Sequence, residues 1–128
     1  MYKPALIWGA LFAGLSVILG AFGAHALEDK LTVALQQTYE TAARYQMYHG
    51  LALLASGLMY AHLPVKALKY ASICFIVGTV LFSGSLYLLT MLKMDGQVGL
   101  GSFGLITPIG GLFFIVGWIL FIAGCLKK

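Results

Sequence analysis

The sequence has very little charge. Only 9% of its 128 residues are Asp, Glu, Lys or Arg, whereas about a quarter of the residues in an average soluble domain are charged. A soluble domain of this size could not cover its surface with so few charges, because 61% of the residues are hydrophobic and the mean hydropathy is +0.94. The same hydrophobicity excludes intrinsic disorder. The composition therefore indicates an integral membrane protein with a single domain, residues 1–128.

Other features that are scarce exclude further classes of protein. No basic run exists, because the net charge of +4 comes from lysines scattered between apolar stretches, and this pattern excludes a nucleic-acid partner. Cys74 and Cys125 lie in apolar stretches without disulfide or metal spacing, so we expect reduced, packed thiols. No H-x-x-x-H, C-x-x-C or E-x-x-H element is present, so we expect neither a metal ion nor a cofactor. A pair of imidazoles from His25 and His49 is the alternative for a metal or haem.

Four segments have the length and apolar character of membrane-spanning helices, which need about 20 residues. They cover residues 4–27, 45–63, 68–92 and 107–126. The first has no charged residue from Pro4 to Leu27 and exceeds the apolar core of a signal peptide, so we expect it to remain as a span. The more polar stretch 28–44 is expected to form either an interfacial helix or an extension of the second helix. The prediction is an all-α bundle of four transmembrane helices.

The distribution of basic residues predicts the orientation of these spans. One side of a four-span chain carries Lys3, Lys66, Lys69, Lys127 and Lys128. The other side carries Lys30, Arg44 and Lys93. Because cytoplasmic loops are enriched in Lys and Arg, we expect a multi-pass protein of the cell membrane with both termini in the cytoplasm.

The second span is the least apolar of the four. Between Gln46 and His62 only four Leu residues favour insertion, by roughly −1 to −2 kcal/mol, whereas eleven Leu, Ile, Val or Phe residues between Ile73 and Leu92 contribute roughly −3 to −6 kcal/mol. The polar face of the second span should therefore look into the bundle, where hydrogen-bonding partners exist.

Small residues repeat at intervals of seven on every span. The triplets are Gly9/Ser16/Gly23, Ala43/Gly50/Gly57, Ala71/Gly78/Ser85 and Gly110/Gly117/Gly124. Close approach of backbones drives association of helices in membranes, so the triplets favour a left-handed bundle. They could serve packing within the chain or contacts between subunits.

Ten polar side chains form a candidate cluster, most of them toward the non-cytoplasmic end. They are His25, Glu40, Arg44, Tyr45, Gln46, Tyr48, His49, Ser83, Tyr87 and Thr107. The spacing of Glu40 and Arg44 favours an ion pair within the helix. The cluster is either a set of satisfied hydrogen bonds that fixes the helix register or a small polar pocket for a ligand, a headgroup or an ion.

Motifs of enzymes are incomplete. Ser56 and His49 share a helix face, but they lie about 10 Å apart along the axis, too far for a nucleophile and its base. The G-x-G-x-x-G match at 99–104 follows no strand and has no acid about 20 residues later, so we interpret it as a flexible loop. We therefore expect no enzymatic activity.

Several segments resemble those of a known family. They are the residues 20–27 (GAFGAHAL), 41–54 (TAARYQMYHGLALL), 82–87 (FSGSLY) and 106–111 (ITPIGG). Together they resemble the YgdD/YwdK-like family of small uncharacterised bacterial inner-membrane proteins, which has a related small transmembrane protein in eukaryotes. The resemblance implies a four-span fold in the inner membrane and no particular activity. The loop 93–103 is longer and richer in glycine than is usual in that family.

The expected function follows from these observations. We expect a non-enzymatic structural or partner-binding bundle that contacts membrane lipids and can form a homo-oligomer. The alternative is a small ligand-binding, lipid-binding or permeation protein that uses the cluster around His25, Arg44 and His49.

Overall fold

The computed structural model describes residues 1–96 and 104–127, which form four long helices. They are α1 (Lys3–His25), α2 (Val33–Met59), α3 (Lys66–Met94) and α4 (Ile106–Cys125). No strand occurs in this described part of the chain, so the prediction of an all-α fold is confirmed. Lys128 lies outside the described residues, and so do most of the loop 93–103 and most of the glycine motif 99–104.

Local sequence explains where the helices begin and end. Pro4 lies in the first turn of α1, where its missing N–H costs no helical hydrogen bond. The Thr32 side chain caps α2 by accepting a hydrogen bond from the Leu35 backbone N–H at 3.2 Å. The turn between α2 and α3 contains Pro64. Gly96 follows α3 with a φ of +82°, a conformation that glycine adopts without steric cost.

The second helix is longer than the expected span 45–63. α2 begins at Val33, and residues 33–44 continue into the rest of the helix without a break. The stretch 28–44 is therefore a short turn followed by the N-terminal part of α2. This part is held to the neighbouring helices by Tyr39 and Ala42, which are both buried.

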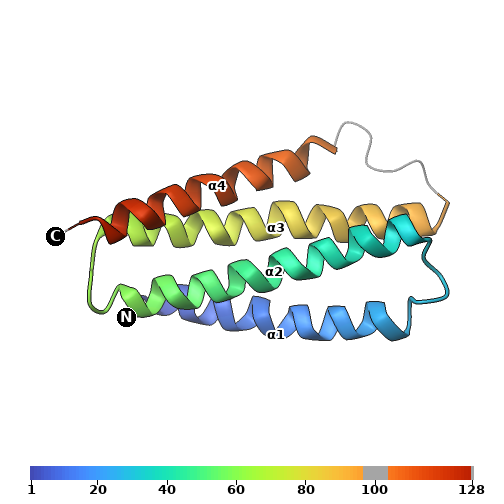
Figure 1. The fold of residues 1–128 in the computed structure, drawn as a ribbon, viewed down its shortest axis with the longest axis horizontal. Helices are drawn as coiled ribbons and strands as arrows, with labels where there is room; N and C mark the ends of the chain where they lie inside the picture. Colours follow the sequence, from blue (N-terminus) through green and yellow to red (C-terminus); the bar gives the residue numbers. More distant parts are fainter. Residues whose placement is uncertain (97–103, 128) are drawn as a thin grey trace.

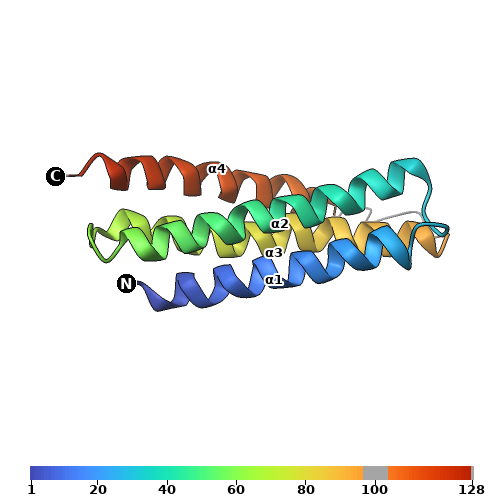
Figure 2. The same cartoon turned by 60° about the horizontal axis from the view of Figure 1, so that its bottom comes forward.

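The helices form a row in chain order. α1 packs against α2, α2 against α3, and α3 against α4, whereas contact between α1 and α3 is slight. Figures 1 and 2 show α1 and α4 at opposite sides of this row. The centre of the row is filled by a cluster of buried apolar residues: Ala5, Phe12, Ala52, Leu53, Ala71 and Phe75.

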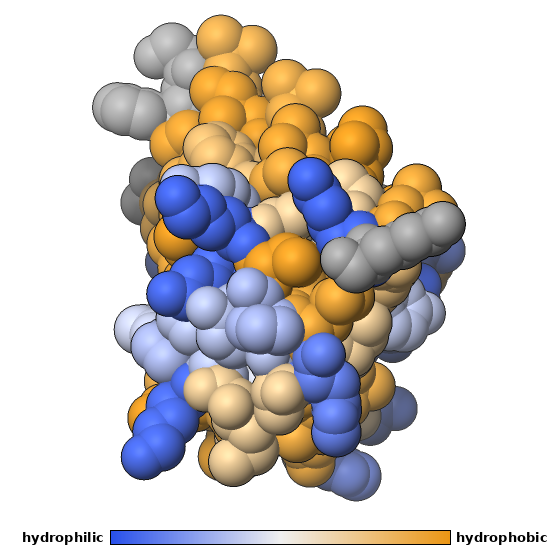
Figure 3. Space-filling view, turned by 90° about the vertical axis from the view of Figure 1, so that its left-hand side faces the viewer, coloured by the Kyte–Doolittle hydropathy of each residue, from blue (hydrophilic) through white to orange (hydrophobic). Residues whose placement is uncertain are grey.

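Both termini lie at the same end of the molecule (Figure 1). The Tyr2 backbone N–H donates to the Gly57 carbonyl oxygen at 3.1 Å, which holds the start of α1 beside the end of α2. Lys69 lies over the rings of Tyr2 and Tyr60, with its Nζ 5.5 and 5.4 Å from their centroids. Figure 3 shows hydrophilic side chains gathered on this end of the molecule.

Three of the four helices are long and apolar enough to cross a membrane by length and composition. They are α1, α3 and α4. Their outward faces carry large exposed apolar side chains, such as Ile18 on α1 and Ile119 on α4. α2 has the length but does not reach the same apolar character among the described residues.

The small-residue triplets lie at helix contacts within the chain. A Cβ added to Gly9 would lie 2.7 Å from the Gly50 carbonyl oxygen, and one added to Gly110 would lie 2.5 Å from the Phe82 backbone nitrogen. Eleven of the twelve triplet residues are buried, and Ala43 is half-buried. Of the two roles considered for the triplets, the structure therefore shows packing within the chain.

Candidate functional site

A network of hydrogen bonds joins the helices at mid-length, and Gln46 lies at its centre. Gln46 is only 4% exposed. Its Nε2 donates to the Phe12 carbonyl oxygen on α1 at 2.9 Å. Its Oε1 accepts from the Tyr87 hydroxyl on α3 at 2.8 Å. One side chain thus links three helices, and both ends of its amide have partners.

Two further bonds tie α2 to its neighbours. The Ser83 hydroxyl on α3 donates to the Ala42 carbonyl oxygen at 2.7 Å, and Ser83 is buried. The Tyr39 hydroxyl donates to the Leu19 carbonyl oxygen on α1. Because each bond needs one particular depth and rotation of α2, together they fix its register against α1 and α3.

His49 extends the network to α4. The Trp118 Nε1–H, which can only donate, lies 3.1 Å from His49 Nε2, so Nε2 must accept. The other ring nitrogen, Nδ1, lies 2.8 Å from the Tyr45 carbonyl oxygen and therefore carries the proton. The imidazole also stacks on Phe114, with the ring centroids 3.6 Å apart and an interplanar angle of 7°. His49 is thus a neutral ring with both nitrogens occupied.

The remaining buried hydroxyl groups also have partners. Ser85 shares a hydrogen bond with Thr107, which joins α3 to the start of α4. Four other buried hydroxyls bond to the carbonyl oxygen four residues earlier in their own helix: those of Ser56, Ser72, Thr79 and Thr90. We call Gln46, His49, Ser83, Tyr87 and Trp118 the inner network.

The structure divides the candidate cluster between the interior and the surface. Gln46, His49 and Ser83 are buried, and Tyr87 and Thr107 are half-buried. Five other members of the cluster are exposed: His25, Glu40, Arg44, Tyr45 and Tyr48.

The polar residues expected to face the bundle in the second span, Gln46, His49 and Ser56, are buried there. The candidate cluster as a whole does not gather inside, because Glu40, Arg44 and Tyr48 are exposed. The reason is helical geometry. Arg44 and Gln46 are two residues apart, so a rotation of about 200° separates them around the helix axis and they lie on nearly opposite sides. Both cannot face the interior of the row. Tyr45 lies at the edge between the two faces, with its ring 5.0 Å from that of Phe82.

The expected ion pair between Glu40 and Arg44 is absent. The two residues are described, and no nitrogen of Arg44 lies within 4.0 Å of a Glu40 carboxylate oxygen. Glu40 instead accepts a hydrogen bond from Gln36 Nε2 at 3.3 Å. Arg44 therefore presents its charge outward without a partner in its own helix.

Polar residues on the outward side of α2 form a continuous surface, which we call the outer polar face and define as Gln37, Glu40, Thr41, Arg44 and Tyr48. Thr41 is half-buried and the other four are exposed. Four of them, all but Tyr48, line a shallow hollow. Gln37 was not among the candidates predicted from the sequence. Its spacing could have identified it, because positions 37, 40, 44 and 48 are three or four residues apart and so lie on the same side of the helix.

The depth of this face follows from the bonds on either side of it. Tyr39 bonds to Leu19 and Gln46 bonds to Phe12, so Glu40 and Arg44 lie level with the stretch of α1 between those two residues. That stretch is the middle of α1 and carries no charge. The bond between Ser83 and Ala42 places the same part of α2 beside the apolar middle of α3. The outer polar face therefore lies at the depth of apolar helix segments.

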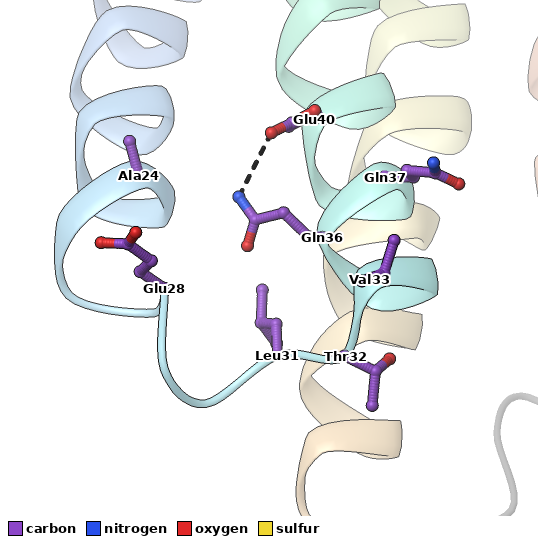
Figure 4. Close-up of a pocket in the computed structure, with 8 residues that line it drawn as sticks. All are labelled: Ala24, Glu28, Leu31, Thr32, Val33, Gln36, Gln37 and Glu40. Atoms are coloured by element: carbon purple, nitrogen blue, oxygen red, sulfur yellow. Dashed lines mark hydrogen bonds between the residues drawn. The ribbon is translucent and has the colours of Figure 1, made fainter.

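A second hollow, of about 420 Å³, lies between the end of α1 and the start of α2 (Figure 4). Its lining includes the carboxylates of Glu28 and Glu40, with Gln36 beside Glu40. The Gln36 Oε1 is buried and has no hydrogen-bond partner among the described residues. Glu40 thus belongs both to this end hollow and to the outer polar face.

His25 and His49 do not meet. His49 lies level with the middle of α1, because its neighbour Gln46 bonds to Phe12, whereas His25 is the last residue of α1. The level of Gln46 is about 13 residues of helix, or roughly 20 Å, from His25, and His49 lies three residues further away. Together with the occupied nitrogens of His49, this separation removes the alternative of a shared metal or haem.

Comparisons with known proteins agree with a membrane location. A family model described as "Protein of unknown function (DUF423)" matches residues 19–111. A UPF0382 membrane protein of Staphylococcus epidermidis is 45% identical over 98% of this chain and 97% of its own. One from Staphylococcus saprophyticus is 42% identical, and YwdK of Bacillus subtilis is 38% identical, each over 98% of both chains. No solved structure matches.

Proposed function

The chain belongs to the DUF423 family of membrane proteins, and from this premise we propose that it is a four-span, non-enzymatic protein of the bacterial inner membrane that binds a protein partner through the outer polar face of α2. The single observation that carries the proposal is the exposure of Glu40 and Arg44 at the depth of apolar helix segments.

The packing of the helices supports a fourth span. α1 and α3 are apolar enough to cross a membrane, and α2 is the only connection between them. α2 lies against both of them along its length and is held to each by side-chain hydrogen bonds. A chain that crosses in α1 and crosses again in the same direction in α3 must return through α2. Four crossings place both termini on one side.

The basic residues support a cytoplasmic location for the termini. Arg44 lies inside α2 and no longer counts as a loop residue. Without it, the end that carries the termini has five lysines in the sequence and the opposite end has only Lys30 and Lys93. The excess of basic residues at the end that carries the termini, which the positive-inside rule assigns to the cytoplasm, is therefore larger than the sequence alone predicted.

The inner network supports a structural role for the buried polar residues. Gln46, His49 and Ser83 each use their polar atoms in hydrogen bonds to a neighbouring helix, so these bonds hold the helices in register. Bonds of this kind contribute about 0.6 kcal/mol each on average in membrane proteins. The alternative of a binding or permeation site around His25, Arg44 and His49 finds no support in the geometry, because the three lie in different environments.

The outer polar face supports partner binding. On the insertion scale, a charged residue near the centre of a spanning helix costs about 2.5–3.5 kcal/mol, so Arg44, level with the middle of α1, would cost about that much against lipid. Glu40 lies nearer the end of the bundle, where it also lines the hollow with Glu28, and adds a smaller cost. The four Leu residues of α2 that lie beyond Gln46 offset only about 1–2 kcal/mol of this. A partner that covers the face with polar groups removes that cost.

Site-specific photo-crosslinking in native membranes tests this proposal. A photoreactive amino acid is introduced at Thr41, in the centre of the outer polar face, and in a matched control at Ile119, an exposed apolar residue of α4. We expect a protein adduct from position 41 and lipid adducts alone from position 119. Lipid adducts alone from both positions would overturn the proposal.

A further inference from the structure

We propose that the partner of the outer polar face is a second copy of this chain, joined in a parallel two-fold dimer in which Arg44 of each copy faces Glu40 of the other. This inference rests on the proposed function and identifies its partner. The observation behind it is that one face of α2 carries one acid and one base, four residues apart, with no ion pair between them.

Charge complementarity favours a second copy. The outer polar face has a net charge of zero, since Glu40 and Arg44 are its only charged members. Arg44 is also the only arginine of the chain. A surface with one positive and one negative group is complementary to itself, which is the requirement for the isologous contact of a two-fold dimer. A partner with charge of a single sign would leave either Glu40 or Arg44 unpaired.

The geometry of a membrane dimer allows the two ion pairs. All copies insert in the same direction, so a two-fold axis between them runs along the membrane normal and the two α2 helices are parallel. Glu40 and Arg44 are about 6 Å apart along the axis. Because side chains of a helix tilt toward its N-terminus, the long Arg44 side chain leans toward the level of Glu40. Each guanidinium can therefore reach the carboxylate of the other copy.

The rest of the same face extends the contact. Continuing along α2 from Tyr48, the exposed residues on this side are Leu51, Ala55 and Leu58. Tyr48, Leu51 and Leu58 are each about half exposed. The N-terminal half of the face is thus polar and the C-terminal half is apolar, and a parallel pairing places like halves together. Helix α2 can pack against its copy along its whole length.

A lipid headgroup explains the face less well. A phosphate would pair with Arg44 but would repel Glu40, which lies on the same face. Headgroups also lie at the ends of membrane-spanning helices, whereas Arg44 lies level with the middle of α1. If lipid alone covered the face, a crosslinker at Thr41 would yield lipid adducts alone.

Charge reversal tests the dimer directly. Chains with two different tags are co-expressed, extracted in native lipid particles, and the fraction of mixed pairs is measured. Because truncating one partner of a buried charge pair is costly, we expect Arg44→Glu or Glu40→Arg alone to raise the apparent dissociation constant by about 30-fold or more. The double variant Glu40→Arg/Arg44→Glu should restore pairing. Arg44→Glu chains should also pair with Glu40→Arg chains.

Two controls keep the test independent of folding. Lys30→Glu reverses an exposed charge in the turn before α2 and should leave pairing unchanged. In a chain whose Cys74 and Cys125 are replaced by Ala, Thr41→Cys should be joined to its copy by a short bifunctional maleimide, whereas Ile119→Cys on α4 should not. This second measurement needs no charge reversal.

The outcomes separate this inference from the proposed function. Restoration by the double variant and crosslinking through position 41 support the dimer. A wild-type chain that is monomeric in native lipid, while Thr41 crosslinks to a different protein, would overturn the dimer and leave partner binding intact. Dimers that respond to none of the three charge variants would place the interface elsewhere and overturn the inference. Lipid adducts alone at Thr41 would overturn both proposals.

Discussion

The contact between α3 and α4 depends on the absence of a side chain at Gly110. A Cβ at this position would lie 2.5 Å from the Phe82 backbone nitrogen and 2.9 Å from both its Cα and its Cβ. These are backbone and proximal atoms, which cannot rotate away. Gly110→Ala must therefore push the two helices apart, and overpacking of this kind costs about 1–3 kcal/mol.

Gly84→Ala is the matched control. Gly84 also lies inside a helix, on α3, but a Cβ added there meets nothing within 4 Å. Replacing glycine by alanine favours the helix by about 0.5–1 kcal/mol at both positions, so this term cancels in the comparison. The free energies of unfolding of the two variants should therefore differ by about 1–3 kcal/mol, with Gly110→Ala the less stable.

Reversible unfolding in mixed micelles gives the free energies. Titration with a denaturing detergent, followed by the loss of helical circular dichroism, compares the two variants under identical conditions. Equal stabilities of Gly110→Ala and Gly84→Ala would refute the packing of α4 against α3 through Gly110.

Three other predictions address the inner network. Gln46→Leu and Tyr87→Phe each remove one partner of the 2.8 Å hydrogen bond from the Tyr87 hydroxyl to Gln46 Oε1. A double-mutant cycle in the same titration should give a coupling free energy of about 0.6–1.7 kcal/mol. Strictly additive effects would argue against the bond. His49 should show a proton on Nδ1 and none on Nε2 in ¹⁵N NMR spectra at neutral pH, because Trp118 donates to Nε2; a doubly protonated ring would contradict this assignment. Ser83→Ala removes the bond to the Ala42 carbonyl oxygen and should lower the free energy of unfolding by about 0.5–1.5 kcal/mol, whereas Thr41→Ala, on the exposed side of α2, should change it much less in monomeric micelles.

Much of the fold could be predicted from the sequence, because spacing along a helix is a local property. The triplet Gly110/Gly117/Gly124 marks the side of α4 that packs against α3, and all three residues are buried. Small residues at intervals of seven identify a contact stripe whatever the partner is. What the spacing could not supply was the order of the helices in a row, which depends on which stripes meet.

The polar cluster was predicted only in part, and Arg44 shows why. Hydropathy identifies α2 as the most polar helix, but not which of its polar sides faces inward. Gln46 and Arg44 are close in sequence and differ in direction by about 200°. Gln46 is inside because Phe12 and Tyr87 supply an acceptor and a donor from neighbouring helices. No residue of the described chain supplies an acid within reach of Arg44, and that information exists only in three dimensions.

The central claim is that α2 crosses the membrane with a charged face exposed, and the direct test is the sidedness of its two ends. In a chain without Cys74 and Cys125, single cysteines replace Lys30, before α2, and His62, after it; both positions are exposed. A membrane-impermeant maleimide is applied to spheroplasts. Position 30 should be labelled at once, and position 62 only after the membrane is permeabilised. Equal labelling of both positions from the same side would contradict the claim, since α2 would then not cross.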